Sequence, residues 1–414
     1  MGIEPALGRA APADLPLTIC LIQPFDPRGR KIGGIESHIR ETIRAVSQDL
    51  RVVLIGIDEV GDLRVGVGQE VEFEERVFTF VPLLTRTGDA HLSAARSLFK
   101  SLTLQFFMSF LRHVPAIRRV LAGRRVSAEI ERFEFASFGR LLGVPTVQIV
   151  HGEGSRDQPM DSLLKRYWFT HQLNEQVALR LATRVVGVNP RIVERIGERF
   201  PFAAGKASMM TVSVNTGIFA PPAGWPSPSL LRIGFAGRLD AFKRPDLMMM
   251  LVAELSRRLD GAVEFHYIGG SDPAAVPGYA AVRANVVAHG TKPAREVAAL
   301  LGGLHAGILC SDFEGMPVYV LELLATGRPL VALDLPQLGL VVEEGVSGTR
   351  VPRGPTERDS IAAMAQAVLD THDRIVRGAI DPAAIRAKIM PYSHTVQTAR
   401  MLDLHRAIAV RRQR

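Results

Sequence analysis

Residues Cys310–Gly327, which read CSDFEGMPVYVLELLATG, decide the fold. The apolar run ending at Cys310 predicts a buried strand. The segment VYVLELLAT predicts a helix, because Pro317 is well tolerated at a first helical position and Gly327 is a natural helix terminator. The loop between them is polar and contains a glycine. A strand, a glycine loop and a helix start predict an anion site, since unpaired backbone N–H groups and the positive helix end face the ligand.

Two carboxylates belong to this segment, Glu314 in the loop and Glu322 within the helix. They suit an anion site if they accept hydrogen bonds from hydroxyl groups of a sugar or ribose. The alternative is that Glu314 caps the helix and Glu322 is an ordinary solvated residue. We favour the ligand role, because Glu322 stands among Leu321, Leu323 and Leu324.

A second segment, GFAGRLDAFKRPD over residues 234–246, places Arg238 and Lys243 around a turn after a predicted strand that ends at Gly237. A guanidinium and an ammonium at the end of a strand suit a diphosphate leaving group, because they stabilise negative charge as the sugar–phosphate bond breaks. An ordinary pair of surface cations is the alternative, and this segment alone does not decide between them.

Two further segments carry glycines after predicted strands. Gly33 and Gly34 precede a predicted helix, and paired glycines let a ligand approach the backbone closely. Their spacing is not GxGxxG, so a dinucleotide cofactor is not indicated. His151 and Gly152 follow the apolar run at 146–150. A lone histidine is more often structural, so a ligand role for His151 depends on the other motifs.

Short apolar runs alternate with amphipathic helices along the chain, a pattern typical of α/β proteins with parallel sheets. One series begins at Leu17, and a second begins near Met209 with MMTVSV. We expect two Rossmann-like domains facing a cleft, with ligands at the carboxyl ends of the strands. The expected parts are a flexible N-terminus over 1–16, an acceptor-binding domain over 17–204, a nucleotide-sugar-binding domain over 205–390 and a C-terminal helix over 391–414.

Composition and missing motifs exclude several classes of protein. No stretch approaches the roughly 20 uninterrupted apolar residues of a membrane-spanning helix, and the N-terminus lacks the pattern of a secretory signal. The two cysteines, Cys20 and Cys310, stand in separate apolar runs and predict buried reduced thiols in a cytoplasmic protein. We find no Walker loop, nucleophile elbow, HExxH or Asp-x-Asp motif, so no metal is indicated.

The formal net charge of +8 is concentrated in part between Ala90 and Ala128, a stretch without acidic residues. Aromatic and aliphatic residues are interspersed there, which predicts an amphipathic helix suited to an anionic membrane surface. An apolar stripe packed on its own domain is an equal alternative. The basic residues are Arg96, Lys100, Arg112, Arg118, Arg119, Arg124 and Arg125.

These segments together resemble the retaining GT-B glycosyltransferases of family 4, the glycosyl transferases group 1, over nearly the whole chain. The tail from Tyr392 resembles the closing helix that crosses back onto the first domain. The residues before Glu314 and the turn Asn215–Gly217 depart from the usual family pattern. The E-x7-E, Gly-Arg…Lys, Gly-Gly-x-Glu and His-Gly elements of the family match Glu314–Glu322, Gly237–Lys243, Gly33–Glu36 and His151–Gly152.

The resemblance implies a role for each matching residue. Arg238 and Lys243 would bind the donor diphosphate. Glu314 would hydrogen-bond the transferred sugar and Glu322 the nucleotide ribose, with neither acting as a nucleophile. His151 and the backbone of the paired glycines would contact the donor from the first domain. The expected donor-site residues are Gly33, Gly34, His151, Gly237, Arg238, Lys243, Glu314, Gly315, Met316, Val318 and Glu322.

We therefore expect a metal-independent, retaining transferase without a cofactor. It would move a hexose-type sugar from a nucleotide-diphosphate sugar to a glycan or lipid-linked acceptor in polysaccharide or glycolipid synthesis. Arg112, Arg118 and Arg119 would face the acceptor or the inner membrane surface. The alternatives are a non-catalytic subunit that binds nucleotide sugar or membrane, an epimerase and a phosphorylase. No recognised nucleic-acid-binding module is present. The donor nucleotide, the acceptor and the oligomeric state stay open.

Overall fold

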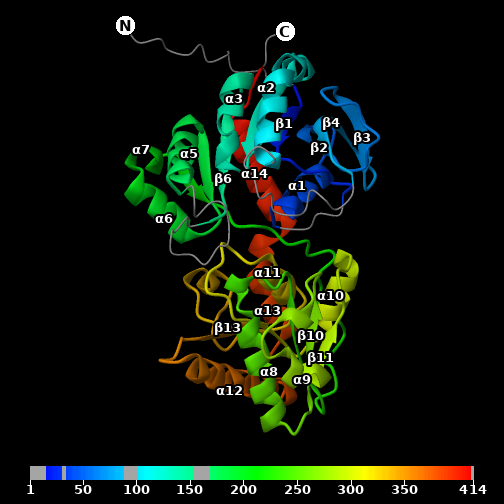
Figure 1. Cartoon of the computed structure of the whole chain (residues 1–414), viewed down its shortest axis with the longest axis vertical. Coiled ribbons are helices and arrows are strands. Elements are labelled where there is room, and N and C mark those ends of the chain that lie inside the picture. Colours follow the sequence, from blue (N-terminus) through cyan, green and yellow to red (C-terminus); the bar gives the residue numbers. More distant parts are fainter. Residues whose placement is uncertain (1–14, 30–33, 88–100, 153–167, 412–414) are drawn as a thin grey trace. The chain divides into compact units, whose positions relative to one another are not determined.

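The computed structural model describes residues 15–29, 34–87, 101–152 and 168–411, and it divides the chain into two compact units. The first unit holds the described residues up to 152, residues 168–210 and those from 398 onward, and the second holds residues 211–397. Each unit has its own sheet flanked by helices (Figure 1). The expected lead-in over 1–16 lies almost entirely outside the described residues.

The first unit is built on a nine-stranded sheet with the order β3-β4-β2-β1-β5-β6-β7-β8, and β15 pairs with β5. Its neighbours are parallel except for the pairs β3–β4 and β15–β5, which are antiparallel. The strands are β1 (Leu17–Ile22), β2 (Leu50–Asp58), β3 (Gln69–Phe73), β4 (Arg76–Thr85), β5 (Arg125–Ile130), β6 (Thr146–Val150), β7 (Arg184–Gly187), β8 (Ala207–Met209) and β15 (Val410–Arg411).

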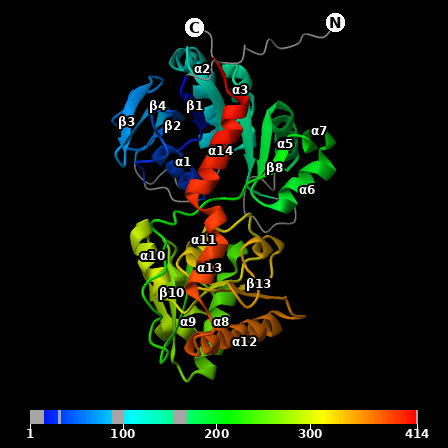
Figure 2. The ribbon, with the colours of Figure 1, turned by 180° about the vertical axis from the view of Figure 1, so that it is seen from behind.

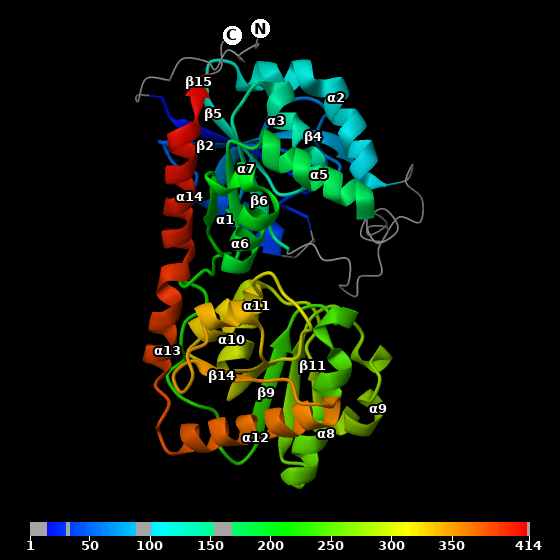
Figure 3. The ribbon, with the colours of Figure 1, turned by 90° about the vertical axis from the view of Figure 1, so that its left-hand side faces the viewer.

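Helices cover both faces of this first sheet, so its central strands are buried on both sides. The helices are α1 (Gly34–Arg44), α2 (Leu102–Leu121), α3 (Ser137–Leu142), α5 (Trp168–Leu181), α6 (Pro190–Arg199), α7 (Pro201–Ala204) and α14 (His394–Ile408), with a 3₁₀ turn at Phe133–Phe135. Alternate residues of β1 serve the two faces: Cys20 and Ile22 pack with α2 and α3, and Ile19 and Leu21 pack with α1 and α14. Figures 2 and 3 show α14 on the face opposite to α2.

The second unit is built on a parallel six-stranded sheet with the order β11-β10-β9-β12-β13-β14. Numbered within the unit, this order is 3-2-1-4-5-6, the Rossmann order. The second and third strands lie on one side of the first strand, and the fourth to sixth strands lie on its other side, so the order of strands reverses between the first and the fourth. The strands are β9 (Leu231–Ala236), β10 (Val263–Ile268), β11 (Val286–Ala288), β12 (Ala306–Leu309), β13 (Leu330–Leu333) and β14 (Gly348–Val351).

Helices also flank the second sheet, where α8 packs with α12 and α11 packs with α10 and α13. One continuous apolar core joins them to the strands. The helices are α8 (Pro245–Arg258), α9 (Tyr279–Val282), α10 (Ala294–Gly302), α11 (Val318–Ala325), α12 (Glu357–Val376) and α13 (Pro382–Ile389). Short 3₁₀ turns lie at Ala241–Lys243, Pro273–Ala275, Arg283–Asn285, Pro336–Leu340 and Met390–Tyr392.

Two sequence-based expectations need correction. The run MMTVSV does not open the second sheet, because β8 covers Ala207–Met209 and pairs in parallel with β7 in the first sheet. Of the later residues of that run, Val214 forms an isolated bridge with Ser393. Residues 205–210, which we expected in the second domain, therefore belong to the first unit. The first sheet otherwise keeps the expected parallel architecture, to which β3 and β15 are added as antiparallel strands.

Gly307 lets α11 pack directly on β12, and it yields a test of this packing. A Cβ at position 307 would collide with the side chains of Leu323 and Tyr319, which come from α11. We expect Gly307→Ala to lower the free energy of unfolding by about 1–3 kcal/mol, the cost of overpacking a filled core. Gly224→Ala is the control, because a Cβ there meets no atom within 4 Å. Chemical denaturation checks both, and equal stability of the two variants would contradict the packing described.

Candidate functional site

The two strands at the reversal of the second sheet, β9 and β12, are neighbours, so the loops after them meet at one edge. Gly237 follows β9 and begins the first loop with a φ of 145°, a value that favours glycine. Cys310 follows β12 and begins the second loop. The backbone N–H of Asp312 donates to the carbonyl of Phe242 at 2.8 Å, and this bond joins the two loops. The two most specific sequence motifs are therefore held side by side.

An ion pair between Lys243 and Glu314 lies where these loops meet. The Lys243 ammonium donates to Glu314 Oε1 at 2.6 Å, and Ser311 Oγ donates to the same oxygen at 2.9 Å. The side chains are largely buried, with 16% and 10% of their surfaces exposed. Gln337 Nε2 also donates to the Glu314 backbone carbonyl at 2.7 Å. The predicted cation and carboxylate thus form one fixed pair.

Aromatic rings surround the Lys243 ammonium. Its Nζ lies 5.1 Å from the centre of the Phe242 ring and 5.9 Å from that of Phe235, both cation–π distances. The Phe242 ring also stacks on Phe313, with their centres 4.6 Å apart. The ammonium therefore has few positions to occupy, and its charge is directed toward the loop before α11.

Helix α11 begins at Val318, as the segment VYVLELLAT predicts, and Pro317 is its N-cap instead of its first helical residue. Its end has the predicted form. Gly327 has a φ of 69°, its N–H donates to Leu324, and the Arg328 N–H donates to Leu323, which together form a Schellman motif. At the other end of the helix, the first-turn N–H groups of α11 face the loop that carries Glu314, because the helix begins directly after this loop. An anion site requires this arrangement.

Glu322 lies on α11 without a counter-ion. No hydrogen bond or ion pair joins its carboxylate to any described side chain, although the residue is only partly exposed. Burial raises the pKa of Glu322 to about 7, because no nearby cation offsets the cost of removing its charge from water. A partly exposed carboxyl of this kind is available to accept hydrogen bonds from a ligand.

The other expected residues of the second unit lie around this site with different exposures. Arg238 has 76% of its side chain exposed and pairs with Asp240 at 2.9 Å, so the structure does not bring it to Glu314. Met316 is buried, and Gly315 and Val318 are partly exposed. Among the described residues, Lys243 is therefore the cation that meets the predicted carboxylate, and Arg238 is free to move toward a ligand by rotating its side chain.

In the first unit, His151 follows β6 and its Nε2 contacts the buried carboxylate of Glu131. Gly33 lies outside the described residues, and Gly34 is the first residue of α1. The strands β1 and β5 are neighbours at the reversal of this sheet, and Glu131 follows β5 directly. The predicted histidine is thus placed at a carboxyl edge of the sheet, where α/β proteins bind ligands.

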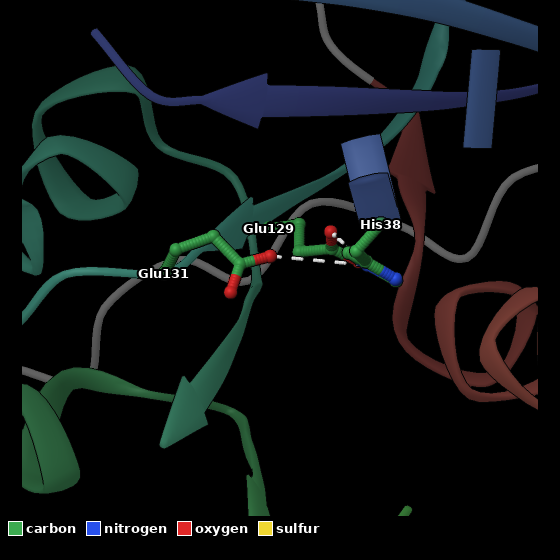
Figure 4. Close-up of side chains that lie close together, drawn as sticks. All are labelled: His38, Glu129 and Glu131. Carbon is green, nitrogen blue, oxygen red and sulfur yellow. Dashed lines mark hydrogen bonds and ion pairs between the residues drawn. The ribbon is translucent and has the colours of Figure 1, made fainter. Parts of the chain in front are cut away.

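Glu131 belongs to a cluster of titratable groups that the motif analysis missed. His38 Nε2 lies 2.9 Å from Glu129 Oε1 and 3.8 Å from Glu131 Oε1 (Figure 4). On the other side of Glu129, His405 Nε2 lies 3.0 Å from Oε2. Burial alone would lower the pKa of His38, but Glu129 and Glu131 raise it to about 9. Burial would conversely raise the pKa of Glu129, and the two histidines hold it far below its usual value.

His38, Glu129 and Glu131 offer nitrogen and oxygen atoms within 4.8 Å of one another, a set whose composition could hold a metal ion. Each already has a protein partner, however. His38 Nε2 donates to Glu129, and His151 occupies one oxygen of Glu131. The contacts are those of an ion-pair network in which the His38 imidazolium lies against the buried carboxylates of Glu129 and Glu131.

The basic stretch before β5 is divided between core and surface. Phe106, Phe110, Ile117 and Leu121 of α2 are buried against the first sheet. The opposite face of the helix is exposed and contains Leu104, Met108, Leu111, Arg112, Pro115, Arg118 and Arg119. The Arg118 guanidinium also donates to the carbonyl of Leu141. Arg96 and Lys100 lie outside the described residues. The apolar stripe thus packs on its own domain, and a second, mixed face stays open.

Two remaining expectations concern cysteines and membrane spans. Cys20 and Cys310 are both buried and free, and burial raises the pKa of each thiol to about 12. Among the described helices, none combines the length and the apolar character needed to cross a membrane.

Comparison with known proteins places these features in context. Residues 231–373, most of the second unit, match the family described as glycosyl transferases group 1. No curated protein matches the chain in a sequence search.

Solved structures extend the likeness over the whole chain. A sucrose-phosphate synthase from Thermosynechococcus elongatus is 18% identical with a TM-score of 0.69, covering 94% of this chain and 98% of that one. An α,α-trehalose-phosphate synthase from Burkholderia xenovorans, solved with glucose-6-phosphate, is 12% identical with a TM-score of 0.66, covering 94% and 100%. HepE from Anabaena, solved with UDP and glucose, is 14% identical with a TM-score of 0.62, covering 93% and 98%.

At such low identity these structures share the fold, and they confirm the expected α/β architecture of two Rossmann-like domains. The match over residues 231–373 is to a family described by glycosyl transfer. Together, the family match and the shared fold support a glycosyltransferase of the GT-B type.

Proposed function

We propose that this chain transfers a hexose-type sugar from a nucleoside diphosphate sugar to a glycan or lipid-linked acceptor, with retention of the anomeric configuration. The observation that carries the proposal is the contact between Lys243 and Glu314 at 2.6 Å, at the start of α11. The Lys243 ammonium suits the phosphate of such a donor, and the Glu314 carboxylate suits its sugar hydroxyls. Their contact supports a binding mode in which a cation and a hydroxyl acceptor would meet the donor near the bond between sugar and phosphate.

The diphosphate would bind at the N-terminus of α11. Its negative charge would be stabilised by the unpaired N–H groups of the helix and by Lys243, which would exchange Glu314 for a phosphate oxygen. Arg238 would turn from the exposed pair with Asp240 toward the same phosphates. These groups supply the positive charge that a metal ion provides elsewhere, and on this ground we propose a reaction without a metal or a cofactor.

Glu314 and Glu322 would bind hydroxyl groups at the two ends of the donor. Glu314, released by Lys243, would accept hydrogen bonds from the transferred sugar. Glu322 has no partner among the described side chains and would accept them from the ribose. Gly237, Gly315, Met316 and Val318 would line the site through their backbone. From the first unit, His151 and the Gly33–Gly34 loop would contact the sugar or phosphate.

The acceptor would approach through the first unit, and the exposed face of α2 suggests where. Leu104, Met108 and Leu111 are 38%, 58% and 41% exposed, and Arg112, Arg118 and Arg119 continue the same face. α2 contains no acidic residue. Apolar side chains beside arginines suit an anionic lipid surface, so we propose that a lipid-linked acceptor is used at the cytoplasmic face of a membrane.

A donor screen tests the proposed reaction. We expect slow release of nucleoside diphosphate from one of the UDP-, GDP- and ADP-sugars in the presence of EDTA. We also expect Glu314→Ala to lower the rate at least roughly 100-fold, the scale of losing a group that stabilises the transition state. Glu343→Ala, which removes a surface partner of Lys388, is the control. If no donor gives turnover or raises the melting temperature, the non-catalytic alternative replaces the proposal.

Glu322→Gln tests the ligand role of an unpaired carboxyl. Because the folded pKa of about 7 lies above the model-peptide value of 4.5, ionisation of Glu322 costs stability as the pH rises between these values. The amide avoids this cost, so the variant should gain about 1–3 kcal/mol over the wild type between pH 4.5 and pH 8. It should also bind nucleoside diphosphate more weakly. Thermal unfolding at both pH values, with and without nucleotide, measures each effect. If the difference in stability between the variant and the wild type were the same at pH 4.5 and at pH 8, the described burial of Glu322 would be contradicted.

Vesicle binding tests the exposed face of α2. The wild type should sediment with vesicles that contain anionic lipid and less with neutral vesicles, since the arginines add electrostatic attraction. Replacing Arg112, Arg118 and Arg119 by Gln should remove this preference, and Met108→Gln should weaken binding to both kinds of vesicle. Met250→Gln, which changes an exposed methionine of α8, is the matched control. Equal sedimentation of all variants with anionic vesicles would exclude α2 as the lipid-binding surface.

A further inference from the structure

A line of polar side chains crosses the otherwise apolar face of the first sheet that carries α1 and α14. Ser127 and Glu129 are alternate residues of β5, so they point to one face, and Glu131 continues the alternation just beyond the strand. The three are buried, with 0%, 1% and 7% of their surfaces exposed. Buried carboxylates are costly unless they are paired, and each of these has a histidine partner from a different part of the chain.

Hydrogen bonds join these groups into one chain of contacts. Ser127 Oγ lies 2.9 Å from His405 Nδ1, and His405 Nε2 lies 3.0 Å from Glu129 Oε2. His38 Nε2 donates to the other oxygen of Glu129 at 2.9 Å. His38 Nε2 also lies 3.8 Å from Glu131 Oε1, and this ion pair links the hydrogen bonds of Glu129 to Glu131. Glu131 in turn contacts His151. This series of contacts extends from α14 through β5 to His151, the histidine expected at the donor site.

The contact with Glu131 assigns the two ring nitrogens of His151. An ionised carboxylate can only accept hydrogen bonds, so Nε2 of His151 must carry its hydrogen toward Glu131. No described residue bonds to Nδ1 of the same ring, and a quarter of the side-chain surface is exposed. In the neutral ring Nδ1 is therefore a fixed acceptor for a ligand hydroxyl, and in the charged ring it is a donor to a phosphate or sugar oxygen.

We propose that Glu131 is a positioning residue that fixes the orientation and the tautomer of His151 for the donor sugar, and that Glu129 and His38 hold α1 to the same strand. The proposal rests on the proposed function, since it assigns His151 to the donor. His38 follows the Gly33–Gly34 loop by one turn of α1. Helix α1 and His151 are thereby joined to β5 and to the residue that follows it.

A purely structural role for Glu131 fits the geometry less well. Its Oε1 has no hydrogen-bond partner among the described residues, and the nearest described cation is His38 at 3.8 Å. A carboxylate kept only for stability would be expected to have both oxygens satisfied, as Glu129 has. The oxygen that is satisfied is the one that faces His151.

The first test reads the tautomer directly and does not depend on activity. Long-range ¹H–¹⁵N spectra of histidine-labelled full-length protein report which ring nitrogen is protonated, and His151→Gln assigns the signal. We expect Nε2–H in the wild type at a pH where the ring is neutral, and a mixture of tautomers in Glu131→Ala. Glu131→Gln keeps the shape if the truncation fails to fold, and its amide can also donate, so it should release the tautomer too. Glu175→Gln is the matched control, because Glu175 is equally buried and pairs with Arg195 and Arg199 instead.

The second test measures donor turnover in the same variants. We expect kcat to fall roughly 10- to 100-fold in Glu131→Gln, the scale seen when a partner that orients a histidine is lost, while KM for the donor changes less. Glu175→Gln should keep wild-type kcat. An unaltered His151 tautomer in the Glu131 variants would overturn the positioning role even if no donor is ever turned over. Wild-type turnover with normal kcat in Glu131→Gln would overturn it while the proposed function stands.

Metal analysis of the purified protein gives a third outcome. We expect less than stoichiometric metal, because His38 Nε2 is assigned as a proton donor to Glu129. One equivalent of tightly bound metal, lost in His38→Ala, would overturn the network as described, since the ion would take the place of that proton.

Discussion

Both units depend on one constraint of parallel sheets, namely that a reversal in strand order leaves the first and fourth strands side by side. In the second sheet these strands are β9 and β12, and in the first, where the antiparallel β3 is an additional strand, they are β1 and the fifth strand, β5. Each pair sends out two loops at the same edge without any strand between them. Lys243 meets Glu314 at one reversal, and His38 meets Glu129 at the other. Side chains distant in sequence become neighbours there because the backbone order requires it.

Three glutamates near these edges have different charge partners, and the differences in their surroundings follow from the neighbouring charges. Glu314 is held by an ammonium, Glu129 by two imidazoles, and Glu322 by no described side chain. Accordingly the pKa of Glu129 is far below its usual value and that of Glu322 is raised to about 7. A carboxyl that costs stability when ionised is hard to explain by folding alone, whereas a ligand that donates hydroxyl groups would recover the cost.

The sequence predicted the local secondary structure better than the pairing of strands and of distant side chains. The strand, loop and helix over 310–327 could be predicted because proline and glycine mark the helix boundaries through backbone geometry. The contact between Lys243 and Glu314 could be expected only through the resemblance, since periodicity does not give strand order. The run MMTVSV is not a strand of the second sheet: only Met209 lies in a strand, which pairs in the first sheet, because an apolar run carries no information about which strand it pairs with.

The cluster around Glu129 was missed for a related reason. Its signal was present in the sequence, since Glu129 lies within the short strand RVSAEI and Glu131 follows it directly. Their partners, however, come from positions 38, 151 and 405, and no local pattern links these positions. The exposed face of α2 shows a further limit: composition indicated basic and apolar residues, but only the packing of Phe106 and Phe110 shows which of them stay at the surface.

The path of the chain has a consequence for how the protein is made. Residues from 398 onward complete the first unit, yet they leave the ribosome only after the whole second unit has been synthesised. Until then, β5 lacks its antiparallel neighbour β15, and Glu129 lacks the imidazole of His405. The nascent first unit thus carries a buried carboxylate with half of its final partners. The described residues of the second unit form one continuous stretch, 211–397, whereas the first unit is completed only by the residues made last.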